Sequence, residues 1–231
     1  MLRIITGMIV VELFGLPGCG KSTLCKEIEA ELQSTGRIVK NDDAVYQNSS
    51  REKVGFVMHQ LSQKEGRKRI IYIISYFSKR YGYKVLLKKF YRIVKIIKMD
   101  LKIMDLSKNN ECDYLILSEG YVQQLLTVLD GNTIDINGNI IRDIATSRDR
   151  YLSVCCGIDI HNSISRINSR SDSNDSFYQM AKNELYTFLE HREKNIERYQ
   201  SRYAGFKVSM IDDVKDNAKL ITNLLMDQYE K

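Results

Sequence analysis

The chain contains no tryptophan, a single proline and only three histidines in 231 residues. The histidines are scattered and do not form a ligand cluster, so we expect no structural metal site. Apolar runs are also short. The longest lie near residues 8–14 and 70–77, well below the roughly 20 residues of a membrane-spanning helix. The first run leads into a glycine-rich segment without a small-residue cleavage site, so we expect no signal peptide.

Cysteines number five, an odd count with no paired spacing. Disulfide frameworks of secreted proteins use even numbers of cysteines, whereas reduced thiols are typical of intracellular proteins. We therefore expect free thiols and a cytoplasmic protein.

What the chain does have is an ordinary globular composition, with 43% hydrophobic and 28% charged residues. Its length suits one sizeable α/β domain, so residues 1–231 are predicted to form a single domain.

A glycine-rich segment near the N-terminus matches the phosphate-binding pattern G-x-x-x-x-G-K-[ST]. Its glycines let backbone N–H groups surround a β-phosphate, and its lysine supplies a mobile cation for the β- and γ-phosphates. The serine hydroxyl group suits Mg²⁺, and a helix starting at the lysine directs its positive end at the same phosphates. We expect the nucleotide to be bound by Gly15, Pro17, Gly18, Cys19, Gly20, Lys21, Ser22 and Thr23.

The surroundings of this segment are those that the motif requires. Residues 8–14 are apolar and β-branched, which predicts a buried strand. Leu24, Ile28 and Leu32 then recur at helical spacing. The order of strand, loop and helix favours a phosphate site over a glycine-rich turn between ordinary elements.

Carboxylates follow two further predicted strands, where ligands bind in open α/β sheets. Asp42 and Asp43 follow the strand predicted at residues 37–40, and Glu119 follows the strand predicted at residues 114–118. A carboxylate beside the phosphate loop is suited to holding Mg²⁺ or its water. The structural alternative for all three is the capping of a following helix.

Between these carboxylates lies a strongly basic region, predicted to form helices at residues 52–81 and 83–106 separated at Gly82. Residues 51–102 hold 15 Lys and Arg against three acidic residues, a net charge of +12 in a chain that carries +6 overall. An apolar stripe in the second helix consists of Leu86, Phe90, Ile93, Ile97 and Leu101, and lysines and arginines lie mostly off it, among them Lys88, Lys89 and Arg92. The alternatives are a solvated basic face, a membrane or nucleic-acid surface, and a binding site for an anionic acceptor.

The second half of the chain is predicted to hold a small hairpin at residues 133–141 and strands at 151–158 and 207–211. A helix predicted at residues 159–170 places Arg166 and Arg170 four residues apart, on one face. Guanidinium groups match phosphate geometry, and the polar loop that follows has the composition of a mobile lid. The alternative is a pair of solvated arginines.

The phosphate loop, the strand ending at Glu119 and the segment Ile164-Ser165-Arg166-Ile167-Asn168-Ser169-Arg170 resemble the P-loop kinases of the nucleoside monophosphate kinase-like class, which includes thymidylate and adenylate kinases. The resemblance implies an α/β, three-layer P-loop NTPase fold with a five-stranded parallel sheet of order 2-3-1-4-5. It also implies a helical acceptor-side region at residues 51–106 and a lid-like segment at 159–180. The chain departs from these kinases at Ser118-Glu119-Gly120-Tyr121, where thymidylate kinases carry Asp-Arg-Tyr and adenylate kinases carry Asp-Gly-Phe-Pro-Arg, so the acceptor stays open.

The implied strand order suggests roles for the candidate catalytic residues Lys21, Asp42, Glu119, Arg166 and Arg170. Glu119, nearer the loop, would hold Mg²⁺ together with Ser22, and Asp42, further out, would act as a base for a hydroxyl acceptor. The expected activity is ATP- and Mg²⁺-dependent transfer of the γ-phosphoryl group to a nucleotide or other small molecule.

Other activities stay open at this point. One is an ATP or GTP hydrolase or switch, although no Asn-Lys-x-Asp segment specific for guanine is present. Another is a polynucleotide kinase, suggested by the basic region, although no nucleic-acid motif is present. A homodimer is also left open.

Overall fold

The computed structural model describes residues 7–46, 61–130, 138–145, 148–169, 177, 180–203 and 206–229. The strands are β1 (Ile9–Gly15), β2 (Val39–Lys40), β3 (Tyr114–Leu117), β4 (Tyr151–Gly157) and β5 (Phe206–Ser209). They form one parallel sheet in the order β2-β3-β1-β4-β5, which confirms the predicted fold class and strand order.

β1 is the central strand, with β3 on one side and β4 on the other. Every residue of β1 is buried, as expected for an apolar, β-branched run in a sheet covered on both faces. The sheet is parallel throughout, so the carboxyl ends of its strands meet at one edge. This edge carries the loop after β1 and the carboxylates after β2 and β3.

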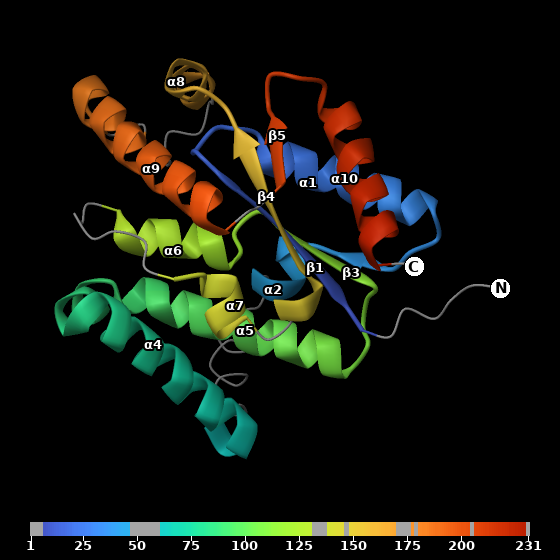
Figure 1. Ribbon diagram of the computed structural model, residues 1–231, viewed down its shortest axis with the longest axis vertical. Helices are drawn as coiled ribbons and strands as arrows, with labels where there is room; N and C mark the ends of the chain where they lie inside the picture. The colour runs from blue at the N-terminus through green and yellow to red at the C-terminus, as the bar shows by residue number, and fades with distance from the viewer. Residues whose placement is uncertain are drawn as a thin grey trace.

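Helices cover both sides of the sheet (Figure 1). α1 (Lys21–Ser34) packs along α10 (Val214–Tyr229) on one side. On the other side lie α5 (Phe90–Lys108), α6 (Tyr121–Leu129) and α9 (Lys182–Tyr203), with α6 packed between the other two. The predicted apolar face of α1 is buried at Leu24, Ile28 and Leu32.

The basic helical region differs in detail from its prediction. α4 (Lys64–Lys88) runs through Gly82, whose φ of 78° kinks the helix, and the break to α5 comes at Lys89. Gly82 has open space around it, so the kink reflects the conformational freedom of glycine. Phe90, expected in the apolar stripe, is 54% exposed, whereas Ile93, Ile97 and Leu101 are buried as predicted. Residues 51–60 lie outside the described residues.

A buried polar link joins the helices of this region. Asp100 on α5 is fully buried and accepts hydrogen bonds from Arg69 Nε (2.5 Å) and Nη2 (2.8 Å) on α4. The hydroxyl group of Tyr121, the first residue of α6, donates to the same carboxylate. Three consecutive helices are therefore fixed to one another through the buried carboxylate of Asp100.

The hairpin predicted at residues 133–141 is wrong in its described part. Residues 140–144 form a short helix, α7 (Ile140–Ile144), and Asn139 caps it by accepting from the backbone N–H groups of Ile141 and Arg142. The turn residues that suggested a hairpin instead begin a helix, because an Asn side chain satisfies free N–H groups at a helix start. Residues 131–137 lie outside the described part.

The remaining described elements are α2 (Asp42–Tyr46), a 3-10 turn (Arg148–Arg150) and α8 (Ile160–Asn168). Of these, α8 lies within the helix predicted at residues 159–170, and the 3-10 turn was not predicted. Within the described ranges, no helix combines the length and apolar character needed to cross a bilayer.

Candidate functional site

The phosphate loop lies between β1 and α1, with its middle pressed against α8. Gly18 and Gly20 have φ values of 76° and 100°, in the left-handed region where glycine is favoured. A Cβ on Gly18 would lie 3.0 Å from both Ile167 Cγ1 and the carbonyl oxygen of Ser163. The Ser163 hydroxyl group also donates to the carbonyl oxygen of Pro17 (2.6 Å). The loop conformation therefore depends on glycines within it and on a helix 140 residues away.

Lys21 is folded back onto this loop. Its Nζ donates to the carbonyl oxygens of Gly15 (3.3 Å) and Leu16 (3.1 Å). Lys21 and Ser22 line a cleft of about 560 Å³ that also reaches Ser118 and Glu119 at the end of β3. The ammonium group therefore lies at the cleft, on carbonyl oxygens that a phosphate group can replace.

Arg166 contacts the phosphate loop from α8. Its Nη1 donates to the carbonyl oxygen of Cys19 (3.0 Å), and its Nη2 donates to that of Met210 (2.9 Å), which follows β5. Arg166 thus contacts the phosphate loop, and its role toward donor phosphates stays a prediction. Arg170, its predicted companion, lies outside the described residues, as does most of the segment predicted as a lid.

Asp42 begins α2 and is held by the end of β3. Its Oδ2 accepts from the backbone N–H (2.9 Å) and the hydroxyl group (2.5 Å) of Ser118. Its Oδ1 is buried and has no hydrogen-bond partner among the described residues. Burial raises the pKa of Asp42, and the bonds from Ser118 act in the opposite direction. One carboxylate oxygen is therefore held by Ser118, and the other is buried without a donor among the described residues.

Glu119 has the opposite surroundings. Its side chain is 49% exposed, and its Oε2 accepts from Lys95 Nζ (2.6 Å) and Gln124 Nε2 (3.0 Å). Burial raises the pKa of Glu119, but the hydrogen bond and charge of Lys95 outweigh it, and the net pKa is lowered. Glu119 therefore presents a charged carboxylate to the cleft. Asp43, by contrast, is exposed, and its backbone N–H bonds to Asn41 (3.0 Å).

The residues proposed for Mg²⁺ are compatible with that ion. Ser22 and Glu119 line the same cleft as Lys21 and present a hydroxyl and a carboxylate, the hard oxygen ligands that Mg²⁺ prefers. Within the described residues, no three His, Cys, Asp or Glu side chains gather as a metal cluster. A fit to Mg²⁺ therefore depends on phosphate oxygens supplying the remaining ligands.

Glu12, in the middle of β1, is a site residue that the sequence reasoning missed. Its carboxylate is fully buried and accepts from the N–H groups of Val122 (3.1 Å) and Gln123 (2.8 Å), at the start of α6, and from the Tyr151 hydroxyl group (2.7 Å). Burial raises the pKa of Glu12 to about 7, and the hydrogen bonds partly offset the effect. The sequence did indicate a special position here, because Glu12 is the one charged residue in an otherwise apolar strand.

Glu12 connects the phosphate loop to α6. A Cβ on Gly120 would lie 2.4 Å from Glu12 Cδ, so only glycine lets the chain pass over this carboxylate. The side chain of Gln123 then accepts from the backbone N–H of Gly15 (3.0 Å), the first residue of the phosphate motif. The start of α6 is thereby fixed between β1 and the loop.

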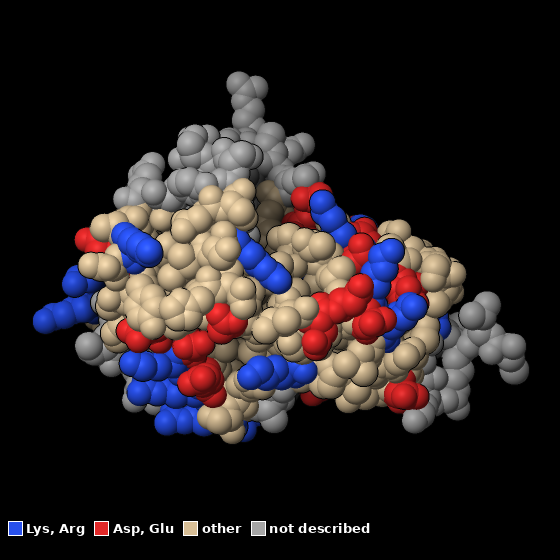
Figure 2. All heavy atoms as spheres, turned by 90° about the horizontal axis from the view of Figure 1, so that it is seen from above, with Lys and Arg blue, Asp and Glu red and all other residues tan. Residues whose placement is uncertain are grey.

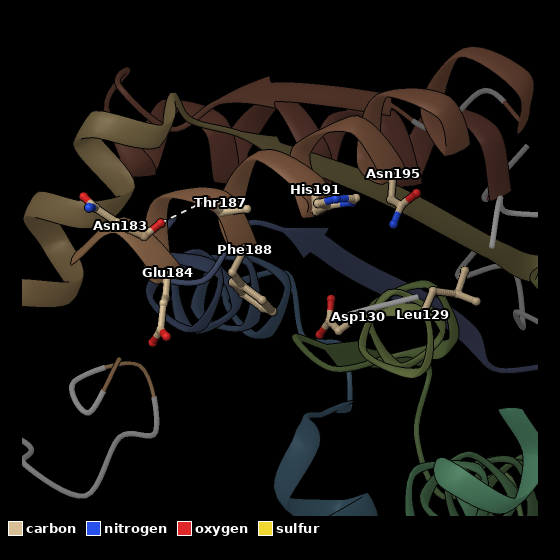
Figure 3. A pocket seen from close by; sticks show the side chains of 8 residues that line it. All are labelled: Leu129, Asp130, Asn183, Glu184, Thr187, Phe188, His191 and Asn195. Atoms are coloured by element: carbon tan, nitrogen blue, oxygen red, sulfur yellow. Dashed lines mark hydrogen bonds between the residues drawn. The ribbon is translucent and has the colours of Figure 1, made fainter. Parts of the chain in front are cut away.

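The far wall of the cleft comes from α6 and α9. Arg192 on α9 pairs with Asp130 at the end of α6, with Nε 3.1 Å from Oδ1, and its guanidinium lies over the Phe188 ring at 5.1 Å. Beyond this pair a second cavity of about 440 Å³ lies between the two helices, and Figure 3 shows Phe188 and His191 of α9 facing Asp130 and Leu129 across it. Periodicity alone could not reveal this wall, because its two sides are 62 residues apart.

Some of the basic region faces the cleft. Arg92 on α5 lines it, and no carboxylate among the described residues pairs with its guanidinium. Lys95 holds Glu119, and Lys89 donates to the carbonyl oxygen of Asp130 (3.0 Å). On the face seen in Figure 2, Lys and Arg side chains are interspersed with Asp and Glu, so this face is not uniformly basic.

Comparisons with known proteins agree with this geometry. The model of a family described as ABC transporter matches residues 4–125, which include the phosphate loop and the end of β3. No curated protein matches the chain.

Solved structures share the fold. A deoxyadenosine kinase from M. mycoides with bound dATP is 18% identical with a TM-score of 0.51, over 94% of this chain and 98% of that one. The same kinase with bound dCTP is 18% identical with a TM-score of 0.51, and the match covers 95% of this chain and 100% of that one. A shikimate kinase from Bacteroides thetaiotaomicron is 11% identical with a TM-score of 0.51, and the match covers 94% of this chain and 98% of that one. These likenesses confirm the predicted resemblance to nucleoside monophosphate kinase-like P-loop proteins at the level of the fold.

Proposed function

The chain belongs to the family of P-loop proteins whose model is described as ABC transporter, and we propose that its own activity is transfer of the ATP γ-phosphoryl group to a small acceptor. The observation that carries this proposal is the extent of the cleft. It runs from Lys21 and Ser22 past the end of β3 to Arg192 on α9, in about 560 Å³. Nucleotide hydrolysis needs space for phosphates and a water molecule. A cleft that continues to a second helical wall offers space for a second substrate.

The donor phosphates are assigned to the loop and its neighbours. Lys21 would exchange the carbonyl oxygens of Gly15 and Leu16 for the β- and γ-phosphates, because a phosphate carries far more negative charge than a carbonyl. Arg166, already bonded to the loop at Cys19, would add a second cation, and Arg170 is proposed to join it from the lid. Both cations would then offset the charge that spreads over the transferred group.

Ser22 and Glu119 are the proposed holders of Mg²⁺, which would neutralise phosphate charge when bound. Glu119 suits this role because its pKa is lowered, so it presents a negative charge across the physiological range. Its bond to Gln124 (3.0 Å) orients the carboxylate toward the cleft wall.

Asp42 is the proposed base for a hydroxyl acceptor. Its buried Oδ1 lacks a donor among the described residues, and a buried acceptor without a donor is unfavourable until one arrives. Ser118, which holds the other oxygen, lines the cleft, so an acceptor hydroxyl beside Ser118 would be within reach of this carboxylate. Its raised pKa brings Asp42 closer to the range in which a carboxylate accepts protons efficiently. For a phosphate acceptor no base is needed, and Asp42 would then only bind.

The acceptor is proposed to be a nucleotide or another small hydroxyl compound. An anionic one is favoured by Arg92, a cleft guanidinium that no described carboxylate neutralises. Phe188 offers an apolar surface deeper in the cleft.

The second candidate is ATP hydrolysis without a small acceptor. The family match favours it, because that match covers the donor half of the site and ends inside α6, before α9 supplies the far wall.

A turnover panel separates the candidates. ATP consumption is measured with Mg²⁺ alone and with nucleosides, nucleotides, sugars, hydroxy acids or oligonucleotides, and phosphorylated products are identified by mass spectrometry. Stimulation and labelling of one small compound support the proposal. Labelled oligonucleotides would instead indicate a polynucleotide kinase. ATP consumption that no compound stimulates or receives would favour the hydrolase.

A further inference from the structure

Two cysteines meet beside the phosphate loop. The sheet register pairs Gly15 of β1 with Cys156 of β4. A Cβ on Gly15 would lie 3.2 Å from Cys19 Sγ and 3.3 Å from Cys156 Cβ, so both side chains occupy the space beside this glycine. The two residues are 0% and 2% exposed, so both side chains are packed inside the protein next to each other. The motif cysteine and a strand cysteine 137 positions later therefore form a contact pair.

The surroundings favour a thiolate at Cys19. The hydrogen bond with Cys156 and the charge of Lys21, whose Nζ lies 3.6 Å from Cys19 Sγ, lower the pKa of Cys19. At Cys25, Cys112 and Cys155 burial instead raises the pKa of the thiol. Since the thiolate is the reactive form, the surroundings of Cys19 favour its reaction with an oxidant.

We propose that Cys19 and Cys156 form a modification site, in which a hydroperoxide oxidises the two thiols to a reversible disulfide. This bond prevents the phosphate loop from binding a nucleotide. Cys19 itself does not line the cleft, but Lys21 does, and its ammonium group lies 3.6 Å from Cys19 Sγ, so the small oxidant has to pass Lys21 to reach the thiol.

The reaction is an ordinary two-step oxidation. The Cys19 thiolate attacks one peroxide oxygen, the O–O bond breaks, and Cys19 sulfenic acid and an alcohol or water result. The Cys156 sulfur then attacks Cys19 sulfur, the S–O bond breaks, and a water molecule leaves with the Cys156 proton. Two thiols lose two electrons in total, and the peroxide takes up both. A dithiol reductant reverses the change.

The loop has little room to adapt to this bond. The two sulfurs of a disulfide lie about 2.0 Å apart, and reaching this distance draws Cys19 toward β4. A Cβ on Gly18 would lie 3.0 Å from Ile167 Cγ1 and a Cβ on Gly20 would lie 3.2 Å from Met210 Cε, so neighbouring side chains pack closely around both glycines. The movement of Cys19 toward β4 therefore displaces the backbone N–H groups that must surround a phosphate. A bound nucleotide opposes the reaction, because Lys21 then turns to the phosphates and no longer stabilises the Cys19 thiolate.

The test treats the nucleotide-free protein with hydrogen peroxide and follows two readouts. One is the tryptic map, in which the peptide of residues 4–21 carries Cys19 and that of residues 151–166 carries Cys155 and Cys156. The other is the affinity for a fluorescent ATP analogue, a readout that does not require the acceptor to be known. Cys156→Ser removes the proposed partner, and Cys155→Ser is the matched control on the same strand.

We expect these two peptides to be joined in the wild type and in Cys155→Ser but not in Cys156→Ser. The affinity should fall about 10²-fold, the scale of a misplacement of about 1 Å at a site, and dithiothreitol should restore it. Prior saturation with Mg-ATP should slow the reaction. If Cys156→Ser does not fold, Cys156→Ala and fragment ions between residues 155 and 156 in the wild type locate the bond. A bond to Cys155, no bond at all, or a Cys19–Cys156 bond that leaves the affinity unchanged would each overturn the proposal.

Discussion

The two sides of the cleft are built in different ways. The donor side consists of the phosphate loop (residues 15–22) with Arg166 of α8, and its contacts are made largely to backbone groups such as the carbonyl oxygens of Gly15 and Cys19. The proposed acceptor side consists of Asp42 and the walls from α5, α6 and α9, and several of its contacts join side chains across the fold, as Asp42 does with Ser118 and Arg192 with Asp130. A loop that binds phosphate through its backbone requires glycines at fixed positions, whereas a wall of side chains can be built from many different sequences. The phosphate loop is thus the part with a recognisable motif, and the proposed acceptor side is the part in which we expect specificity to lie.

The largest effect should come from the acceptor side, at Asp42. Asp42→Asn should lower acceptor phosphorylation by about 10²–10⁴-fold, the range that a positioned base contributes, and should leave Mg-ATP affinity unchanged. Steady-state kinetics and nucleotide binding measure the two separately. Glu119→Gln is the matched variant and should weaken every Mg²⁺-dependent step instead. Normal phosphoryl transfer by Asp42→Asn would remove Asp42 as the base and leave Asp43 or Glu119 as candidates.

Lys21 should give the largest effect on the donor side. Lys21→Ala should reduce turnover by about 10²–10³-fold with every acceptor, the scale of one electrostatic group lost from a transition state. Its fold should be kept, because Lys21 makes only two hydrogen bonds to loop carbonyls and one to a thiol. Circular dichroism and ATP turnover provide the check. A variant that turns over ATP at nearly the wild-type rate would contradict the role of the whole loop.

Glu12 tests how strongly the two sides are coupled, because it binds the start of α6, and Gln123 then holds Gly15. The pKa of Glu12 is raised from 4.5 to about 7, so the folded state retains a proton that the unfolded state releases between these values. The contribution of Glu12 to the free energy of unfolding therefore falls as the pH rises from 4.5 to 7 and does not change further above pH 7. Glu12→Gln has no carboxylate at this position and does not lose this stability. Its free energy of unfolding, relative to that of the wild type, should therefore rise by on the order of 3 kcal/mol between pH 4.5 and 7.

Denaturant unfolding at several pH values measures this difference. The control is Glu111→Gln, whose carboxylate pairs with Lys40 and has a lowered pKa, so its pH dependence should be small and of opposite sign. A wild-type minus Glu12→Gln difference that stays flat between pH 4.5 and 7 would show that the buried carboxylate is not protonated there.

Arg92 should show the smallest effect and would sharpen the description of the acceptor. Arg92→Ala should raise the KM for an anionic acceptor about tenfold, the cost of a hydrogen bond to a charged group, with little change in kcat. Lys88→Ala, an exposed basic residue at the end of α4, should leave both parameters unchanged. Equal effects of both variants that disappear at high salt would instead indicate long-range attraction by the basic region.

The sequence by itself determined the donor side and the layout of the sheet. A buried strand, a glycine loop and an amphipathic helix follow one another within about 25 residues, so local spacing was sufficient to predict residues 8–32. Asp42 and Glu119 were also found from sequence, because polar residues at strand ends stand out beside apolar runs. The different surroundings of these two carboxylates could not be predicted from sequence, because Ser118 and Lys95 contact them only in the folded chain.

The tertiary structure alone decided the far wall, the Cys19–Cys156 contact and the role of Glu12. Arg192 and Asp130, Cys19 and Cys156, and Glu12 and Gln123 are each separated by more than 60 residues. Such pairs leave no periodicity in the sequence, because each depends on how helices pack on a sheet rather than on the spacing within one element. The hairpin wrongly predicted at residues 133–141 shows the same limit at short range, since Asn139 suits both a turn and a helix cap and its neighbours in the fold select the cap.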